Sequence, residues 1–270
     1  MINAQKIYAG EIVKLPPTPE SLKLVELVRT ILSKTYQSKD LLKIEFAISQ
    51  KEHYQKGLLA KHNLSHNHKI HQALSKLLQK YTSRVDLLWF DVPRLRIIST
   101  TAHQIPSAAP AYAIHRDTWY ANSESQFNWW MPIFDTQAQN TFGIYTDYFE
   151  TAVINDSILF DYAEWKNAGG FQSEKAMNKH FPELKQTIDK TREFKPILKA
   201  GEILVFSASH LHGTLANYTD ETRISIDFRT VNILDWQSQI GAINVDNASK
   251  GNCIKDFLHA IDYSHFPYEA

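Results

Sequence analysis

The spacing of apolar residues changes about one third of the way along this sequence of 270 residues, and no other feature constrains the fold as much. From Leu22 to Leu32, apolar residues recur at three- and four-residue intervals behind Thr18, an N-cap residue followed by proline. This pattern predicts an amphipathic helix over 18–36, and the spacing stays helical from about 39 to 83. After that it gives way to short β-branched and aromatic runs broken by Pro, Asn, Asp and Gly. The chain is therefore predicted to be helical first and mainly β afterwards.

Four apolar runs in the second part are predicted strands, RLRIIST, QFNWWMPIF, EILVF and RISIDFRTV, with an inserted helical stretch near Ser173 to Lys190. Many short strands with helices gathered at one end predict a jelly-roll barrel (a cupin-like double-stranded β-helix) with a helical flank. A chain of this length can bury one large core, so we expect a single domain over 1–270. Within it we expect a mainly helical flank at 1–85, the jelly-roll core at 86–235 and a C-terminal extension at 236–270.

The charge balance narrows the class of partner. The 29 basic and 29 acidic residues cancel, and neither sign forms a long run, so nucleic acid and anionic membranes are not expected as partners. A small-molecule substrate is favoured, whereas the oligomeric state leaves no mark on the sequence. Cys253 is the only cysteine, which excludes an intramolecular disulfide and a thiolate metal cluster. No apolar run approaches membrane-spanning length and no leader segment is recognisable, so we expect a cytoplasmic protein.

A histidine-rich segment, KHNLSHNHKIHQ, invites a metal-binding interpretation. His62 and His66 lie four residues apart, and His68 and His71 lie three apart. No carboxylate shares this helix face, and zinc sites need a defined third and fourth ligand. We therefore interpret the segment as polar helix surface.

Two other histidine motifs lie in the predicted β region. In AIHRDTWY, His115 and Asp117 are two residues apart and point to the same side of an extended segment. Further on, His210 and His212 end the apolar run EILVFSAS. Two histidines and one carboxylate on one face of a barrel match the triad that binds Fe(II) while leaving positions open. The residues by themselves leave open whether His210 or His212 completes it.

The strand that follows alternates strictly. Three apolar side chains occupy one face of it, Ile224, Ile226 and Phe228, whereas Arg223, Ser225, Asp227 and Arg229 occupy the other. If the apolar face packs under the helices, Arg223 points into the mouth of the barrel. An arginine in such a place needs an anion.

Taken together, these motifs resemble the phytanoyl-CoA dioxygenase-like family of Fe(II)/2-oxoglutarate oxygenases. That family shows H-x-D, a glycine-acid turn, an apolar strand, H-G-S/T, an Asn, and an Arg eleven positions after the distal His. This chain has His115-x-Asp117, Gly201-Glu202, ILVF, His212-Gly213-Thr214, Asn217 and Arg223, in order and in register. The resemblance covers about 111–231 and selects His212 over His210.

The resemblance implies roles for individual residues. His115, Asp117 and His212 would be the catalytic iron ligands, and Arg223 and Thr214 would hold the distal carboxylate of 2-oxoglutarate. Arginine matches a carboxylate with its bidentate fork. Asn128 is predicted to contact the other end of the co-substrate, with a structural amide as the alternative.

The substrate prediction departs from the acyl-CoA hydroxylases. Where the family shows N-G-P-L and P-G-S-H segments, this chain has QNTFGIYTDYFE, and no basic patch suggests a site for CoA phosphates. The sequence around the H-x-D motif instead looks like a branch that tailors natural products. We therefore expect an oxidoreductase that uses Fe(II), 2-oxoglutarate and O2 to oxidise a C–H bond of a small polar, amino-acid-like metabolite. Hydroxylation is expected, with dealkylation or ring closure as possible outcomes, because Asp117 leaves no vacancy for a halide.

Several side chains are candidate substrate contacts: Arg116, Arg96, Trp119, Tyr120 and Trp130. For the arginines the alternative is an ordinary ion pair, and about two of the four aromatics, counting Trp129, are expected in the core. Two other functions are alternatives. A non-catalytic jelly-roll module could bind a small ligand, and a cupin-like metal isomerase would have no use for Arg223 or Thr214.

Overall fold

The computed structural model describes residues 1–100, 102–104, 112–169 and 181–266. The helices are α1 (Ala4–Tyr8), α2 (Pro19–Tyr36), α3 (Ile44–Ala47), α4 (Gln50–Ser65), α5 (His68–Gln79), α6 (Tyr162–Asn167) and α8 (Ile233–Gln237). The strands are β1 (Val13–Leu15), β2 (Leu88–Phe90), β3 (Arg94–Ile98), β4 (Gln126–Pro132), β5 (Phe142–Ile144), β6 (Ile203–Ser207), β7 (His212–Thr214), β8 (Arg223–Asn232) and β9 (Leu258–His259). Short 3-10 turns lie at Val85–Leu87, Ala102–Gln104, Asp117–Tyr120, Thr146–Tyr148, Ser157–Leu159 and Ile254–Asp256.

The predicted first helix is confirmed as α2. Thr18 is its N-cap and forms a capping box with Ser21, with Pro19 at the first helical position. Two of the orphan groups at this helix end are thereby satisfied, because each side chain bonds the other residue's backbone N–H. The predicted helical region that follows is also confirmed, as α3, α4 and α5.

The helix expected near 173–190 is only partly testable, since 173–180 lie outside the described residues. Residues 181–190 form no helix, so that part of the prediction is wrong. Their backbone is paired elsewhere: Leu184 bridges Asn155, and the Lys185 N–H donates to the Ile154 carbonyl at 2.8 Å. Pairing with a distant segment has overridden the local helical spacing.

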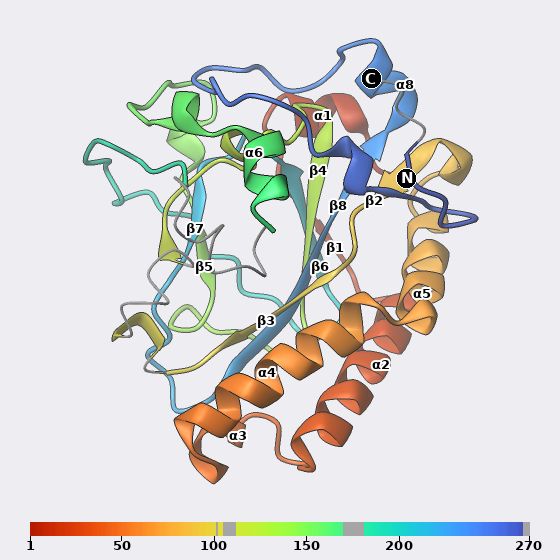
Figure 1. The fold of residues 1–270 in the computed structure, drawn as a ribbon, viewed down its shortest axis with the longest axis vertical. Coiled ribbons are helices and arrows are strands. Elements are labelled where there is room, and N and C mark those ends of the chain that lie inside the picture. The colour runs from red at the N-terminus through yellow and green to blue at the C-terminus, as the bar shows by residue number, and fades with distance from the viewer. Residues whose placement is uncertain (101, 105–111, 170–180, 267–270) are drawn as a thin grey trace.

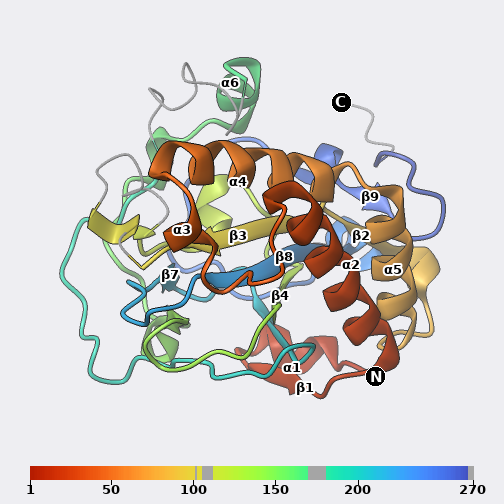
Figure 2. The same ribbon diagram turned by 90° about the horizontal axis from the view of Figure 1, so that it is seen from below.

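The large sheet has the order β1-β6-β4-β8-β2-β9, with β3 also paired to β8, and all of its pairings are antiparallel. One face of it packs against the helices. Leu95, Trp129 and Ile226 from the sheet share a buried cluster with Val28 and Leu74 from α2 and α5. Figure 1 shows the helices α2 to α5 gathered on this side, and Figure 2 shows them from below.

The opposite face of the large sheet looks toward a small antiparallel sheet of β5 and β7. A second apolar cluster joins the two, with Trp130 and Phe206 from the large sheet and Phe142 and Ile144 from the small one. Antiparallel sheets with helices on one side are thus present, as predicted, although the described helices together hold more residues than the strands. Among the described residues, no helix has both the length and the apolar character needed to cross a membrane.

Candidate metal centre

His115 and His212 are brought together by backbone pairing. They form an isolated antiparallel bridge, in which each backbone N–H donates to the other residue's carbonyl at 2.9 Å. Gly213 makes this approach possible, because a Cβ there would lie 3.3 Å from the Ala113 carbonyl oxygen and 3.3 Å from the Ile114 Cα. The glycine of the H-G-T motif is therefore explained by close packing of two chain segments.

Asp117 completes the cluster. Its backbone N–H donates to the Ala208 carbonyl at 3.0 Å, which ties the start of the 117–120 turn to the end of β6. One ligand atom from each of His115, Asp117 and His212 lies within 4.8 Å of the other two. Among the described residues, these three form the group of histidines, cysteines and carboxylates that could hold a metal ion.

Both imidazoles are oriented by backbone carbonyls. His115 Nδ1 lies 2.9 Å from the Ala113 carbonyl oxygen, and His212 Nδ1 lies 2.9 Å from the His210 carbonyl oxygen. A carbonyl only accepts, so each Nδ1 carries the proton and each Nε2 presents a lone pair. Those Nε2 atoms face Asp117 Oδ1 at 3.4 Å and 3.9 Å. This is the arrangement expected of metal-binding histidines.

The electrostatics suit a cation. Burial lowers the pKa of His212 to about 4, with the nearby His115 adding to the effect, so its imidazole is neutral at neutral pH. Burial acts to raise the pKa of Asp117, but the hydrogen bond with His115 and the charge that His212 carries below its own pKa outweigh it and lower the pKa to about 2, so the carboxyl is ionised at neutral pH. At neutral pH the cluster therefore presents a neutral His212 imidazole and an ionised carboxylate beside His115.

The second oxygen of Asp117 is held by protein groups. Arg229 Nε donates to Asp117 Oδ2 at 2.9 Å, and Gln126 Nε2 lies 3.4 Å from the same oxygen. Arg229 Nη1 also donates to Asp91 Oδ2 at 2.9 Å. The alternation of apolar and polar residues in β8 predicts that Arg229 lies on the polar face. It does not predict that Asp91, Gln126 and Asp117 lie close together beside it.

His210 lies elsewhere. Its side chain is fully buried, and its ring packs against Phe149 with the centroids 4.5 Å apart. Its nitrogens lie 3.2 Å from the carbonyl oxygens of Ser207 and Gly10. The structure thus brings His212, not His210, to Asp117.

Arg223 is a buried cation with unmet hydrogen-bonding capacity. It is 4% exposed, and its Nη1 donates to the Thr141 carbonyl. Its Nε has no hydrogen-bond partner among the described residues. Burial lowers the pKa of Arg223 to about 10, which still leaves the guanidinium charged at neutral pH.

Two further buried hydroxyls near Arg223 lack a partner within the described part of the chain, those of Ser225 and Tyr112. Ser225 is two residues along β8 and shares the Arg223 face, and Tyr112 is close enough to interact electrostatically with the guanidinium. Thr214 on β7 pairs with Phe142, the neighbour of Thr141. Sequence reasoning missed Ser225, although its spacing from Arg223 was visible, and it missed Tyr112, for which no signal existed.

Asn128 lies on the same face of β4 as Gln126, two residues earlier in the strand. It is 6% exposed and sits opposite Arg229 in the register of β4 and β8. Its Oδ1 accepts from Gln126 Nε2 at 2.9 Å, so Asn128 belongs to the polar group around Asp117.

Two of the candidate substrate residues are placed away from the site. Arg116 is 1% exposed; its Nε donates to Asp246 Oδ1 at 3.0 Å, and its other nitrogens donate to backbone carbonyls. Trp119 is fully buried and donates to the same Asp246 oxygen at 2.8 Å. Neither side chain is available to bind a substrate. Arg116 is buried in an ion pair with Asp246, and Trp119 is buried with its N–H bonded to the same aspartate. The alternative of an ordinary ion pair holds for Arg116.

Tyr120 and Arg96 are the candidates that remain accessible. The Tyr120 ring meets the His115 ring edge-on, with centroids 5.3 Å apart. Arg96 is 44% exposed and binds Asp227, Nε to Oδ1 at 2.7 Å. Trp130 is 6% exposed and packs on Phe142 between the two sheets. Trp129 stacks on Phe228 in the core between the large sheet and the helices.

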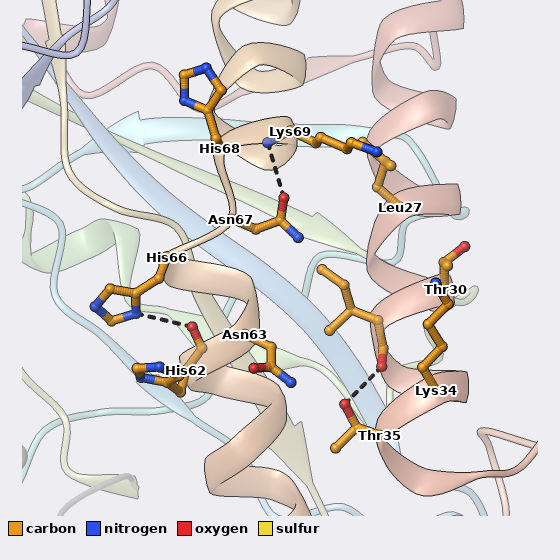
Figure 3. Close-up of a pocket in the computed structure, with 11 residues that line it drawn as sticks. Leu27, Thr30, Lys34, Thr35, His62, Asn63, His66, Asn67, His68 and Lys69 are labelled. Carbon is orange, nitrogen blue, oxygen red and sulfur yellow. Dashed lines mark hydrogen bonds between the residues drawn. The ribbon is translucent and has the colours of Figure 1, made fainter.

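The histidine-rich segment lines a surface groove of about 670 Å³ between α2 and the α4–α5 corner. The rings of His62 and His66 lie 4.3 Å apart, but His68 is turned away from both (Figure 3). His71 is buried and bonds the Ser65 carbonyl at 2.8 Å. The groove is a clear surface pocket, but among the described residues its histidines form no metal-binding cluster with a carboxylate. His62, His66 and His68 lie on the helix surface as predicted, whereas His71 is buried.

Neither a family model nor a curated protein matches this chain. Solved structures similar to it include the non-heme monooxygenase ThoJ in its apo form, at 15% identity over 85% of this chain and 76% of that chain, with a TM-score of 0.44. Another is EvdO2 from Micromonospora carbonacea var. aurantiaca complexed with 2-oxoglutarate, at 12% identity over 86% and 91%, with a TM-score of 0.48. A third is SnoN, a non-heme alpha-ketoglutarate-dependent epimerase from nogalamycin biosynthesis, at 13% identity over 85% and 83%, with a TM-score of 0.39.

ThoJ and SnoN are named as non-heme enzymes, and EvdO2 was solved with 2-oxoglutarate bound. Their likeness to this chain is distant, so its function has to follow from its own residues.

Proposed function

We propose that the protein is an Fe(II)- and 2-oxoglutarate-dependent oxygenase in which His115, Asp117 and His212 bind the iron. The observation that carries this proposal is the convergence of their ligand atoms within 4.8 Å. Two imidazoles and one carboxylate are the donor set of non-heme Fe(II) oxygenases, which leave positions open for co-substrate and oxygen. Both imidazoles already present Nε2, so the donors fit this metal.

The fold proposal follows the same lines. The large sheet and the β5–β7 sheet would be the two walls of a jelly roll, and the chain would form a single oxygenase domain over 1–270. The metal ligands lie where the first residue of β7, His212, approaches the polar side of the large sheet, beside Asp117 and Arg229.

Arg223, Ser225 and Tyr112 would bind the distal carboxylate of 2-oxoglutarate, with the Thr214 hydroxyl beside them. The support is the set of orphaned buried atoms, Arg223 Nε, Ser225 Oγ and Tyr112 Oη. Buried polar groups are rarely left without partners, and a buried guanidinium calls for an anion. A carboxylate would satisfy all three donors at once. Asn128 would lie toward the end of the co-substrate nearest the iron.

When bound, Fe(II) with 2-oxoglutarate and O2 would supply the oxidant for a substrate C–H bond, with succinate and carbon dioxide as co-products. The chain would contribute by positioning. Asp117 occupies one ligand position and so leaves no vacancy for a halide, which favours oxygenation of the substrate. Tyr120 would form a wall of the substrate site, because its ring lies against His115.

The substrate is proposed to be a small polar, amino-acid-like metabolite, as in natural-product tailoring. Arg96 and Asp227 support this, because they present opposite charges side by side on the polar face of β3 and β8. A zwitterionic group could bind such a pair, with its carboxylate on Arg96 and its ammonium on Asp227.

The test is to load the purified protein with Fe(II) without oxygen, add 2-oxoglutarate and air, and quantify succinate by mass spectrometry. We expect slow, iron-dependent succinate formation that an amino-acid-like substrate accelerates. A protein that binds iron but never consumes 2-oxoglutarate would contradict the proposal and favour a metal isomerase. Stimulation by acyl-CoA thioesters alone would contradict the substrate class.

A further inference from the structure

Arg229 occupies an unusual place beside the proposed iron ligand. It is 8% exposed, lies within β8, and is flanked by β4 and by the segment that follows β2. Its Nε donates to Asp117 Oδ2 and its Nη1 donates to Asp91 Oδ2, both at 2.9 Å. One guanidinium therefore joins two buried carboxyl groups from distant parts of the chain.

Asp91 in turn holds Arg229 in position. Its Oδ1 accepts the Arg229 backbone N–H at 2.6 Å, and its Oδ2 is also 3.0 Å from Arg94 Nη2. Both ends of Arg229 are thus fixed, the backbone by the sheet and the guanidinium by two acceptors. Only arginine can donate in this way, because its planar fork presents several N–H groups in fixed directions.

The consequence falls on Asp117. Its Oδ2 is engaged by Arg229, with Gln126 Nε2 3.4 Å away, so Oδ1 is the oxygen turned toward the two histidine Nε2 atoms. A carboxylate free of such partners can bind a cation through both oxygens. One whose second oxygen is occupied binds through the first alone.

We infer that Arg229 is a positioning residue that makes Asp117 a one-oxygen ligand and so keeps an additional coordination position open for co-substrate. The inference rests on the proposed metal centre and assigns to Arg229 a role that neither the motif nor the ligand set contains. Arg229 acts through Asp117 and does not touch the metal. The same contact holds the carboxylate in one orientation before any metal arrives.

Mn²⁺ alone is the probe for the test, because the water molecules on bound Mn²⁺ can be counted from the broadening of its electron paramagnetic resonance lines in ¹⁷O-labelled water. Removing Arg229 by itself would take one guanidinium away from two buried carboxyl groups, so the test variant is the double substitution Arg229→Gln with Asp91→Asn. The matched control is Asp91→Asn alone, which disturbs the same buried network but keeps Arg229 against Asp117. Circular dichroism confirms that both are folded.

We expect the unmodified protein and Asp91→Asn to hold the same number of waters on Mn²⁺, and the double variant to hold about one fewer. With Fe(II) loaded, the double variant should also lose about 10- to 100-fold in succinate formation. An unchanged water count in the double variant would overturn the inference, as would an equal loss in Asp91→Asn. If the unmodified protein binds neither Mn²⁺ nor Fe(II), the metal centre itself is wrong and this inference falls with it.

Discussion

Two regions of this protein gather histidines, and they differ in nearly every physical respect. Around the α4–α5 corner, His62, His66 and His68 are close in sequence, exposed, and set beside a groove of about 670 Å³. Between the sheets, His115 and His212 come from distant segments and meet Asp117, which is 3% exposed.

The difference shows what a cluster needs if it is to hold a metal ion. Closeness in sequence puts three imidazoles around one helix corner but gives them no shared direction, and water remains a competing partner. In the second region a backbone bridge sets the separation of two histidines, two carbonyls set their tautomers, and a buried carboxylate supplies the charge. A large pocket is the usual first choice for a binding site. Here convergence of donors is the better guide.

The largest effect is expected from removing a ligand. His212→Ala should reduce metal binding and succinate formation to background, since two donors remain where three converged. The matched control is His62→Ala with His66→Ala, which removes two exposed histidines and should leave both quantities unchanged. Titration with Co²⁺ and mass spectrometry of succinate measure the two effects. Loss of metal binding in the control would place the metal at the exposed histidines of the α4–α5 corner instead.

His210→Ala separates the two adjacent histidines. Because His210 packs against Phe149 away from the cluster, metal binding should persist although the protein is destabilised by roughly 1–3 kcal/mol through lost packing and hydrogen bonds. Urea unfolding and Co²⁺ titration measure these two properties. The assignment of His212 fails if this variant loses the metal while His212→Ala keeps it.

Arg223→Met is expected to weaken 2-oxoglutarate binding by about 2–5 kcal/mol, because the carboxylate loses its charged partner in a buried place. Ser225→Ala removes one neutral donor from the same spot and should weaken binding by only about 0.5–1.5 kcal/mol. Calorimetry on the metal-loaded protein gives both dissociation constants. Equal affinities for the unmodified protein and Arg223→Met would refute the carboxylate site.

Two glycine substitutions test whether close packing matters more between the His115 and His212 segments than within helix α4. Gly213→Val forces side-chain atoms against the Ala113–Ile114 backbone, so His115 and His212 should separate and metal affinity should fall roughly tenfold. Gly57→Ala in α4 places a Cβ 3.4 Å from the Tyr36 hydroxyl, an ordinary contact, and should stabilise the helix by about 0.5–1 kcal/mol. Thermal unfolding with and without Co²⁺ distinguishes them. Similar behaviour of the two variants would count against the role given to Gly213.

The smallest effect concerns pH. Burial lowers the pKa of four histidines, so the folded state favours their neutral forms: His53, His71, His210 and His212. A histidine with a lowered folded pKa contributes stability above its ordinary pKa of about 6.5 and loses it as the pH falls below that value. Urea unfolding at pH 8 and pH 5.5 should therefore show lower stability at pH 5.5. In His71→Gln the difference should shrink; an undiminished difference would show that His71 does not contribute.

Much of this molecule was predictable from local pattern. The spacing of apolar residues predicted α2 and the helices after it, and alternation in RISIDFRTV predicted which face of β8 is polar. The order H-x-D, H-G-T and Arg223 named three side chains that the structure brings together and one buried cation nearby. Such signals survive because they depend on neighbours in the chain, or on a pattern already known from related proteins.

Only the tertiary structure decided the partners of those side chains. From the sequence Arg116 is a candidate substrate contact, but in the structure it forms an ion pair with Asp246. Arg229 has no role assigned from the sequence, yet it binds Asp117. Tyr112 and Ser225 became notable only as hydroxyls left without partners beside Arg223. Local periodicity determines the face on which a side chain emerges. What it meets there depends on strand register and on how distant segments cross, and these are properties of the folded chain as a whole.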